Sequence, residues 1–146
     1  MISLYDQSSL ESFRRAQGMD PFHLKRLFQR HFIDASDAAT SIAEVPLRFR
    51  AALQSEVCFA ELRLDQQQDS QVDKATKLLF RTAAASAVET VILRAPGRRV
   101  SVCVSSQAGC AAGCRFCATA LMPSVTNLSC GEIVDQIVQV NRLLAA

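Results

Sequence analysis

The stretch "VSVCVSSQAGCAAGCRFCATA", residues 100 to 120, joins an alternating segment to a cluster of cysteines. Valine at every second position from Val100 predicts a β-strand whose two faces differ. Cys110, Cys114 and Cys117 then follow within eight positions. A helix-like segment comes next, so the order is strand, cysteine loop, helix. This order is typical of the opening unit of an α/β barrel or sheet.

The cysteine spacing, C-x3-C-x2-C, indicates a metal site that has three ligands from one loop. Zinc normally takes four protein ligands, but His23 and His31 lie far away in the sequence. Cys130 stands at a predicted helix start, which is an awkward position for a fourth ligand. Iron–sulfur clusters are held by thiolates, and three thiolates would leave one iron open to a substrate or cofactor. A structural zinc site or an unmetallated thiol loop remains the alternative.

The residues between the cysteines support a loop wrapped around a cluster. Gly109 and Gly113 precede the first two cysteines, and glycine tolerates the positive φ angles of tight turns. Phe116, between the last two cysteines, is expected to give the cluster or its ligand an apolar wall.

The segments on either side extend this unit. Downstream, Ser129 and Glu132 predict a capping box that starts a closing helix. We expect one face of this helix to be apolar and the other polar. The apolar face would hold Ile133, Ile137, Val140 and Leu144, and the polar face Asp135, Gln139 and Arg142. Upstream, "KLLFR" (77–81) and "VETVILR" (88–94) predict a β-hairpin, and the polar "DQQQDSQVDK" (65–74) a loop or hairpin tip.

The beginning of the chain predicts a small helical module. Ser8 with Glu11 suggests a capping box for a helix over 8–16, Asp20-Pro21 a second helix start, and Pro46 a third. We therefore divide the chain into residues 1–64, a helical domain, residues 65–99, a hairpin connection, and residues 100–146, the strand–loop–helix unit.

The composition sets limits on the class of protein. The 146 residues are 49% hydrophobic and carry a net charge of +2, so the chain can bury a core, and no strong basic bias announces nucleic acid. The first residues lack the pattern of a signal peptide, and no apolar run approaches the ~18 residues of a membrane span. Clustered cysteines without a secretory signal favour metal or redox chemistry in the reducing cytoplasm.

Three stretches resemble a known family: "CVSSQAGCAAGCRFCAT" (103–119), "VETVIL" (88–93) and "NLSCGEIVDQI" (127–137). C-x3-C-x-Phe-C is the signature of radical S-adenosylmethionine (SAM) enzymes. The wider pattern resembles the adenine-C2 RNA methyltransferases, which are the dual-specificity 23S rRNA/tRNA enzymes and their antibiotic-resistance relatives. The resemblance implies a fold of α+β then α/β: an N-terminal helical accessory domain, a β-hairpin, and the first strand, loop and helix of a radical SAM (β/α) barrel.

The resemblance also implies cofactors and roles for residues. Cys110, Cys114 and Cys117 match the ligands of a [4Fe-4S] cluster whose open iron takes S-adenosylmethionine, beside Phe116. Glu89 matches a glutamate regarded as the proton acceptor. Cys103 matches a cysteine that forms a transient disulfide bond to release the methylated product. In such enzymes one S-adenosylmethionine methylates a cysteine near the C-terminus, and a second is the source of the radical that activates this methyl group.

The implied partners are 23S rRNA, tRNA and an electron donor such as flavodoxin or ferredoxin, and we expect a cytoplasmic monomer without a membrane anchor. A complete (β/α) barrel needs on the order of 200 residues, and about 50 follow Arg94. Over 119–128 the chain also departs from the family pattern, since two glycines, a phenylalanine and an arginine are replaced. We therefore expect either the N-terminal part of such an enzyme or a truncated, non-catalytic paralogue that acts as an iron–sulfur or zinc RNA-binding module.

Overall fold

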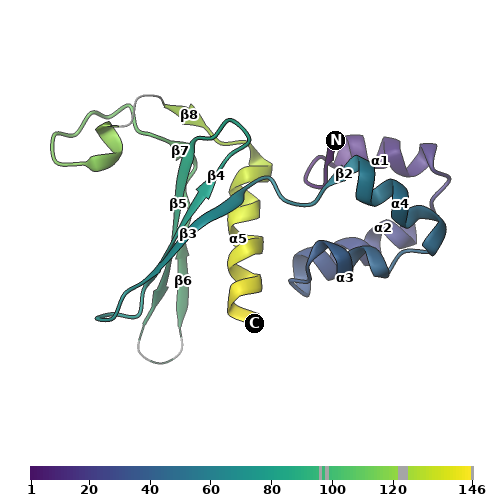
Figure 1. The fold of residues 1–146 in the computed structure, drawn as a ribbon, viewed down its shortest axis with the longest axis horizontal. Helices are drawn as coiled ribbons and strands as arrows, with labels where there is room; N and C mark the ends of the chain where they lie inside the picture. The colour runs from purple at the N-terminus through teal and green to yellow at the C-terminus, as the bar shows by residue number, and fades with distance from the viewer. Residues whose placement is uncertain (96, 98, 122–124, 146) are drawn as a thin grey trace. The chain divides into compact units, whose positions relative to one another are not determined.

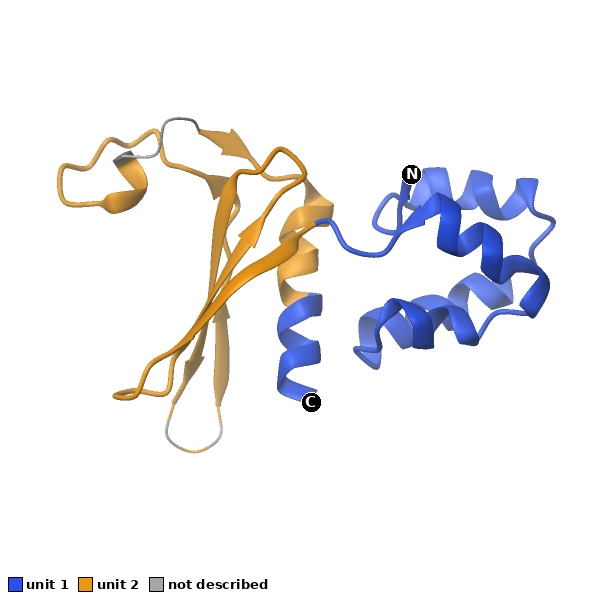
Figure 2. Cartoon of the chain, viewed as in Figure 1, with its two compact units in different colours: residues 1–61, 138–146 blue, residues 62–137 orange. Residues whose placement is uncertain are grey.

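The chain divides into two compact units in a computed structural model, which describes all residues except 96, 98, 122–124 and 146. The first unit comprises residues 1–61 with 138–146, and the second residues 62–137 (Figure 2). The predicted division at 99/100 falls inside the second unit. Part of the stretch that departs from the family pattern, 122–124, lies outside the described residues. Among the described residues, no helix is long and apolar enough to cross a membrane.

The first unit is helical and has one apolar core. Within residues 1–61, a short parallel pair, β1 with β2, joins the start of the chain to the segment that follows the helices, through Ile2 opposite Val57. The elements are β1 (Ile2–Ser3), α1 (Gln7–Ala16), α2 (Pro21–Phe28), the π-helical turn η1 (Gln29–Ile33), α3 (Ala38–Ala43), α4 (Leu47–Glu56) and β2 (Val57–Cys58). The core contains Leu4, Leu10, Phe13, Met19, Leu27, Ile42, Val45, Phe49, Leu53 and Val57.

The helix starts follow the sequence signals with one correction. The second helix begins at Pro21 after the N-cap Asp20, as predicted. The prediction of Ser8 as the first N-cap is wrong: Asp6 is the cap, and its Oδ1 accepts from the amides of Ser8 and Ser9 at 3.1 and 3.2 Å. The nearer carboxylate satisfies these free amides, so the helix begins one residue earlier than expected.

The second unit is built on a four-stranded antiparallel sheet in the order β3-β4-β5-β6 (Figure 1). The strands are β3 (Arg63–Asp69), β4 (Thr76–Arg81), β5 (Ala87–Arg94) and β6 (Val100–Cys103). The predicted hairpin of β4 and β5 is confirmed, with Leu79 opposite Glu89. The prediction of a loop or hairpin tip over 65–74 is correct for its second half, which connects β3 to β4. It is wrong for its first half, because the polar residues up to Asp69 pair with β4 as an exposed edge strand.

The two faces of the sheet differ in burial. We call the face that the last helix covers the closed face, and the opposite face, which carries Glu89, the open face. Along β4 and β5 alternate residues are buried, namely Thr76, Leu78, Phe80, Val88, Thr90 and Ile92. The first half of α5 (Cys130–Ala145) covers this closed face, where the Thr90 hydroxyl donates to Oε1 of Gln136 at 2.7 Å. The predicted capping box of α5 is confirmed, since Ser129 and Glu132 exchange two hydrogen bonds.

The buried face of α5 differs from the predicted apolar stripe. Val140 is buried as expected, but Ile137 and Leu144 are 42% and 43% exposed. Asp135, which we placed on the polar side, is fully buried together with Gln136. Both have hydrogen-bond partners inside the unit: Asp135 accepts from the amide of Leu62 at 2.8 Å, and Gln136 contacts two strand segments. Hydrogen-bonded polar groups therefore occupy part of the face that periodicity assigned to solvent.

A second, smaller antiparallel pair closes the base of the cysteine loop. β7 (Gln107–Ala108) pairs with β8 (Thr126–Asn127), and a 3-10 turn, η2 (Ala118–Leu121), lies between them in the sequence. The three clustered cysteines therefore lie on an excursion whose two ends are held together.

Candidate active site

The open face of the sheet brings Glu89 and Cys103 together on neighbouring strands. Cys103 in β6 lies directly opposite Val91 in β5. Residues two apart in a strand share a face, so Glu89 lies on the same side as Val91 and Cys103. Both Glu89 and Cys103 are exposed. The two residues that resemblance marked as catalytic are thus accessible diagonal neighbours on one surface.

Lys77 is the charged neighbour of Glu89. Its Nζ lies 3.4 Å from Oε1 of Glu89, across from β4 to β5, and the two side chains are 48% and 55% exposed. Exposed pairs of this kind contribute less than about 1 kcal/mol. The pair therefore leaves the carboxylate oxygens of Glu89 accessible to solvent.

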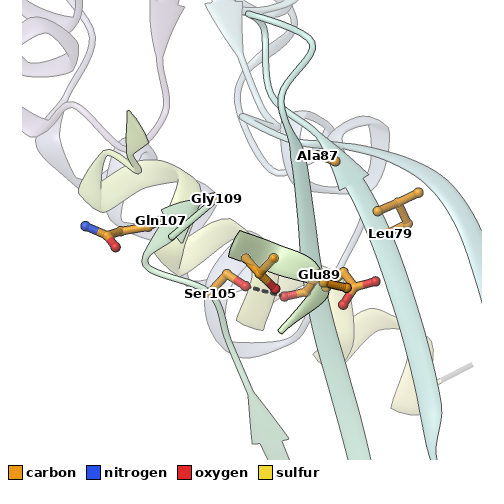
Figure 3. A pocket seen from close by; sticks show the side chains of 8 residues that line it. Leu79, Ala87, Glu89, Ser105, Gln107 and Gly109 are labelled. Atoms are coloured by element: carbon orange, nitrogen blue, oxygen red, sulfur yellow. Dashed lines mark hydrogen bonds between the residues drawn. The ribbon is translucent and has the colours of Figure 1, made fainter. Parts of the chain in front are cut away.

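A pocket of about 220 Å³ joins this face to the cysteine loop (Figure 3). The sheet lines it with Leu79, Ala87 and Glu89, and the segments around the loop with Ser105, Gln107, Gly109, Ala118 and Thr119. Gly109 directly precedes Cys110, and Ala118 directly follows Cys117. The pocket is smaller than the ~300–1,000 Å³ of typical ligand sites, so it has room for only part of a ligand of that size.

The cysteine loop has the backbone that its glycines predict. Gly109 and Gly113 both have positive φ angles, 76° and 64°. The amide of Cys117 donates to the carbonyl of Cys114 at 3.1 Å, which tightens the turn between the last two cysteines. The loop is open to solvent, because Cys114 is exposed while Cys110 and Cys117 are half-buried.

The donor set fits an iron–sulfur cluster in its chemistry. All three thiols are free, and hydrogen bonds from the backbone and side chain of Thr119 lower the pKa of Cys117, which favours the thiolate that binds iron. Among the described residues, no three cysteine, histidine or acidic side chains converge closely enough to hold a metal ion. The ligand roles of Cys110, Cys114 and Cys117 therefore stay a prediction that rests on loop, spacing and donor type.

Phe116 and His31, two further residues named from the sequence, lie in opposite environments. Phe116 is 94% exposed and forms no wall with the described residues, so its cofactor contact also stays a prediction. His31 is fully buried in the helical unit, where it contacts Tyr5, Phe32 and Phe59. His31 is therefore a core residue of the first unit.

Sequence reasoning missed Ser105 and Gln136. The Ser105 hydroxyl donates to the Glu89 carbonyl at 2.7 Å (Figure 3). The Ser105 backbone in turn exchanges two hydrogen bonds of 2.9 Å with the side chain of Gln136. A serine and a glutamine in a polar context carry no sequence signal of such a role. Only the alternation of β6, continued to 105, hinted at the position of Ser105.

Known proteins resemble the chain over nearly its whole length. No family model matches. The chain is 38% identical over 144 residues to "Probable dual-specificity RNA methyltransferase RlmN 2" of Opitutus terrae, which spans 97% of the chain and 33% of that protein. It is 38% identical over 133 residues to "Dual-specificity RNA methyltransferase RlmN" of an Anaeromyxobacter species, over 91% of the chain and 35% of that protein. The chain thus spans about a third of the length of these curated relatives.

A solved structure supports the fold. The crystal structure of a radical SAM methyltransferase from Sphaerobacter thermophilus matches with a TM-score of 0.86 and 32% identity, over 99% of the chain and 42% of the matched protein. The predicted fold class is confirmed by this match.

Proposed function

The chain is homologous, over nearly its whole length, to the RlmN-type radical SAM RNA methyltransferases, and from this premise we propose that it forms the accessory unit and the cluster-binding start of the catalytic unit of such an enzyme. The reaction is methyl transfer to C2 of adenine in 23S rRNA and in the tRNA anticodon loop. The observation that carries the proposal is the pocket that Glu89 shares with Gly109 and Ala118, the residues that flank the first and last clustered cysteines.

Cys110, Cys114 and Cys117 would hold the [4Fe-4S] cluster, and Phe116 would contact the cofactor. Together with S-adenosylmethionine, the cluster supplies radical chemistry, which suits a ring carbon that offers no lone pair to an ordinary methyl donor. The electron would come from a flavodoxin or ferredoxin. We place the protein in the cytoplasm as a monomer.

The chain's own residues handle protons and product release. The Glu89 carboxylate accepts a proton at its Oε atoms, which the open face leaves accessible beside Lys77. The exposed thiol of Cys103, once deprotonated, would attack the sulfur of a methylene thioether that links the base to a cysteine outside this chain. The S–S bond forms as the S–C bond breaks, and the electron pair of the broken bond leaves with the carbon, which takes up a proton and becomes the methyl group of the freed base. Because the chain spans about a third of its relatives, methyl transfer requires the remaining parts of the enzyme.

Anaerobic reconstitution with iron and sulfide tests the proposal. We expect about four irons per chain and a brown protein with visible charge-transfer absorption. Cys110→Ala, Cys114→Ala and Cys117→Ala should each abolish iron retention, because two thiolates do not hold the cluster. Cys58→Ala is the matched control, since Cys58 lies in the first unit, where its thiol donates to the carbonyl of Ala60.

Stoichiometric zinc without iron, or unchanged iron in the loop variants, would contradict the proposal. The first result would favour the alternative of a structural zinc module. Iron that is lost equally in Cys58→Ala would show that the loop is not the binding site.

A further inference from the structure

The side chain of Gln136 is a fully buried amide that none of the proposed chemistry uses. It projects from α5 toward the closed face of the sheet. Its Oε1 accepts from the Thr90 hydroxyl at 2.7 Å and from the Ser105 amide at 2.9 Å, and its Nε2 donates to the Ser105 carbonyl at 2.9 Å. One side chain therefore fixes β5 next to Glu89 and both backbone groups of Ser105.

Ser105 carries this constraint to the open face. Its hydroxyl donates to the Glu89 carbonyl at 2.7 Å, so β5 and the segment after β6 are joined at the level of Glu89 (Figure 3). The chain then continues through β7, which begins at Gln107, to Gly109 and the first clustered cysteine. Ser105, Gln107 and Gly109 all line the pocket with Glu89.

We propose that Gln136 is a positioning residue, which sets Glu89 against the base of the cysteine loop by holding Ser105 from behind the sheet. This inference rests on the proposed function, because an active site needs Glu89 and the cysteine loop to keep a fixed position relative to each other. A site held by buried hydrogen bonds behind it is pre-organised before a ligand arrives.

Amide hydrogen exchange of the full chain tests the proposal. Gln136→Met keeps the length and removes every hydrogen bond of the amide, so Ser105 loses a partner for its N–H and its C=O. We expect the Ser105 amide to exchange roughly tenfold faster or more, and the segment 104–109 to follow. Amides in the middle of β4, at Leu78 and Phe80, should keep their wild-type rates.

Two further variants separate positioning from general stability. Asp135→Asn changes the neighbouring buried polar side chain of α5, which accepts from the amide of Leu62. It should leave exchange at 104–109 unchanged. Gln136→Glu should restore slow exchange at Ser105, because a carboxylic acid that burial keeps protonated again offers one acceptor and one donor.

Equal acceleration across β4 and 104–109 in Gln136→Met, or equal acceleration at 104–109 in Asp135→Asn, would overturn the proposal, and so would a failure of Gln136→Glu to slow exchange. The exchange measurement needs no metal. Failure of wild-type iron uptake would therefore count against the proposed function alone, while the exchange pattern still decides the role of Gln136.

Discussion

Glu89 and Thr90 are neighbours in β5 and meet opposite environments on the two faces of one sheet. Thr90 is fully buried, and its hydroxyl is bonded to Gln136 of α5. Glu89 is exposed, and its carboxylate is paired only loosely with Lys77. The closed face holds the strands in place by packing and satisfied hydrogen bonds. The open face can therefore present accessible reactive groups without a large loss of stability.

The largest expected effect lies on the closed face. Phe80 is fully buried in β4, so Phe80→Ala should lower the free energy of unfolding by about 3–5 kcal/mol, through lost transfer energy and a cavity. Urea denaturation measures this loss. Leu79→Ala, one position along on the open face and half-buried, is the matched control and should cost clearly less. Equal losses would break the distinction between the two faces.

The first unit also contains a buried titratable group, the imidazole of His31. Burial, with a contribution from the positive charge of Arg142, lowers the pKa of His31 to about 4. The unfolded chain, with histidine near 6.5, binds more protons than the folded chain between these pH values. Stability should therefore fall as pH drops from about 6.5 to about 4, by on the order of 2–3 kcal/mol.

Denaturation at a series of pH values measures this slope. His31→Gln should flatten it between pH 5 and about 6.5, where few carboxylates titrate. A slope that persists in His31→Gln would show that another group causes it.

Removal of one hydroxyl on the closed face sharpens the comparison. Thr90→Val keeps the shape of the side chain and takes away one of two donors to Oε1 of Gln136. We expect a loss of about 1 kcal/mol in the free energy of unfolding. The same measurement on a Gln136→Met background should show a smaller effect of Thr90→Val, because the two side chains share the bond. Full additivity would mean that this hydrogen bond contributes nothing.

The smallest effect should come from the open face. Lys77→Met removes the partner of Glu89 at a half-exposed position. The free energy of unfolding should change by less than about 0.5 kcal/mol, and this change should shrink further as salt is added, because salt screens an exposed ion pair. A loss as large as that of Thr90→Val would show that the open face also stabilises the sheet.

The sequence was most informative where local chemistry is strong. The turn at Gly113, the helix start at Pro21 and the capping box of Ser129 were all predictable, because glycine, proline and capping side chains act on the adjacent backbone. Successive residues of a strand point to alternate faces, so Glu89 of β5 points away from the face that holds Val88 and Thr90.

The sequence was least informative where long-range hydrogen bonds replace apolar packing. Gln66 belongs to β3, an exposed edge strand of mostly polar residues. The backbone pairing of β3 with β4, and not apolar packing, holds this strand in the sheet. Asp135 looks solvent-facing in a helical pattern, and Gln136 is a polar residue with no apolar signal. Their partners Leu62 and Ser105 lie far away in the chain. Such partners cannot be read from periodicity, because burial of a polar side chain depends on a match that only the tertiary structure supplies.

The most direct test of the account is whether the cluster forms beside the Glu89 end of the open face. In the reconstituted and reduced chain, the paramagnetic cluster should broaden the amide resonances of nearby residues. We predict strong broadening at Glu89, Ser105 and Gly109, with sharp signals for Thr76 and Arg94 at the other end of β4 and β5. Sharp signals at Glu89 and Ser105, or broadening of equal strength at Thr76, would contradict the claim that the cysteine loop and the open face form one site.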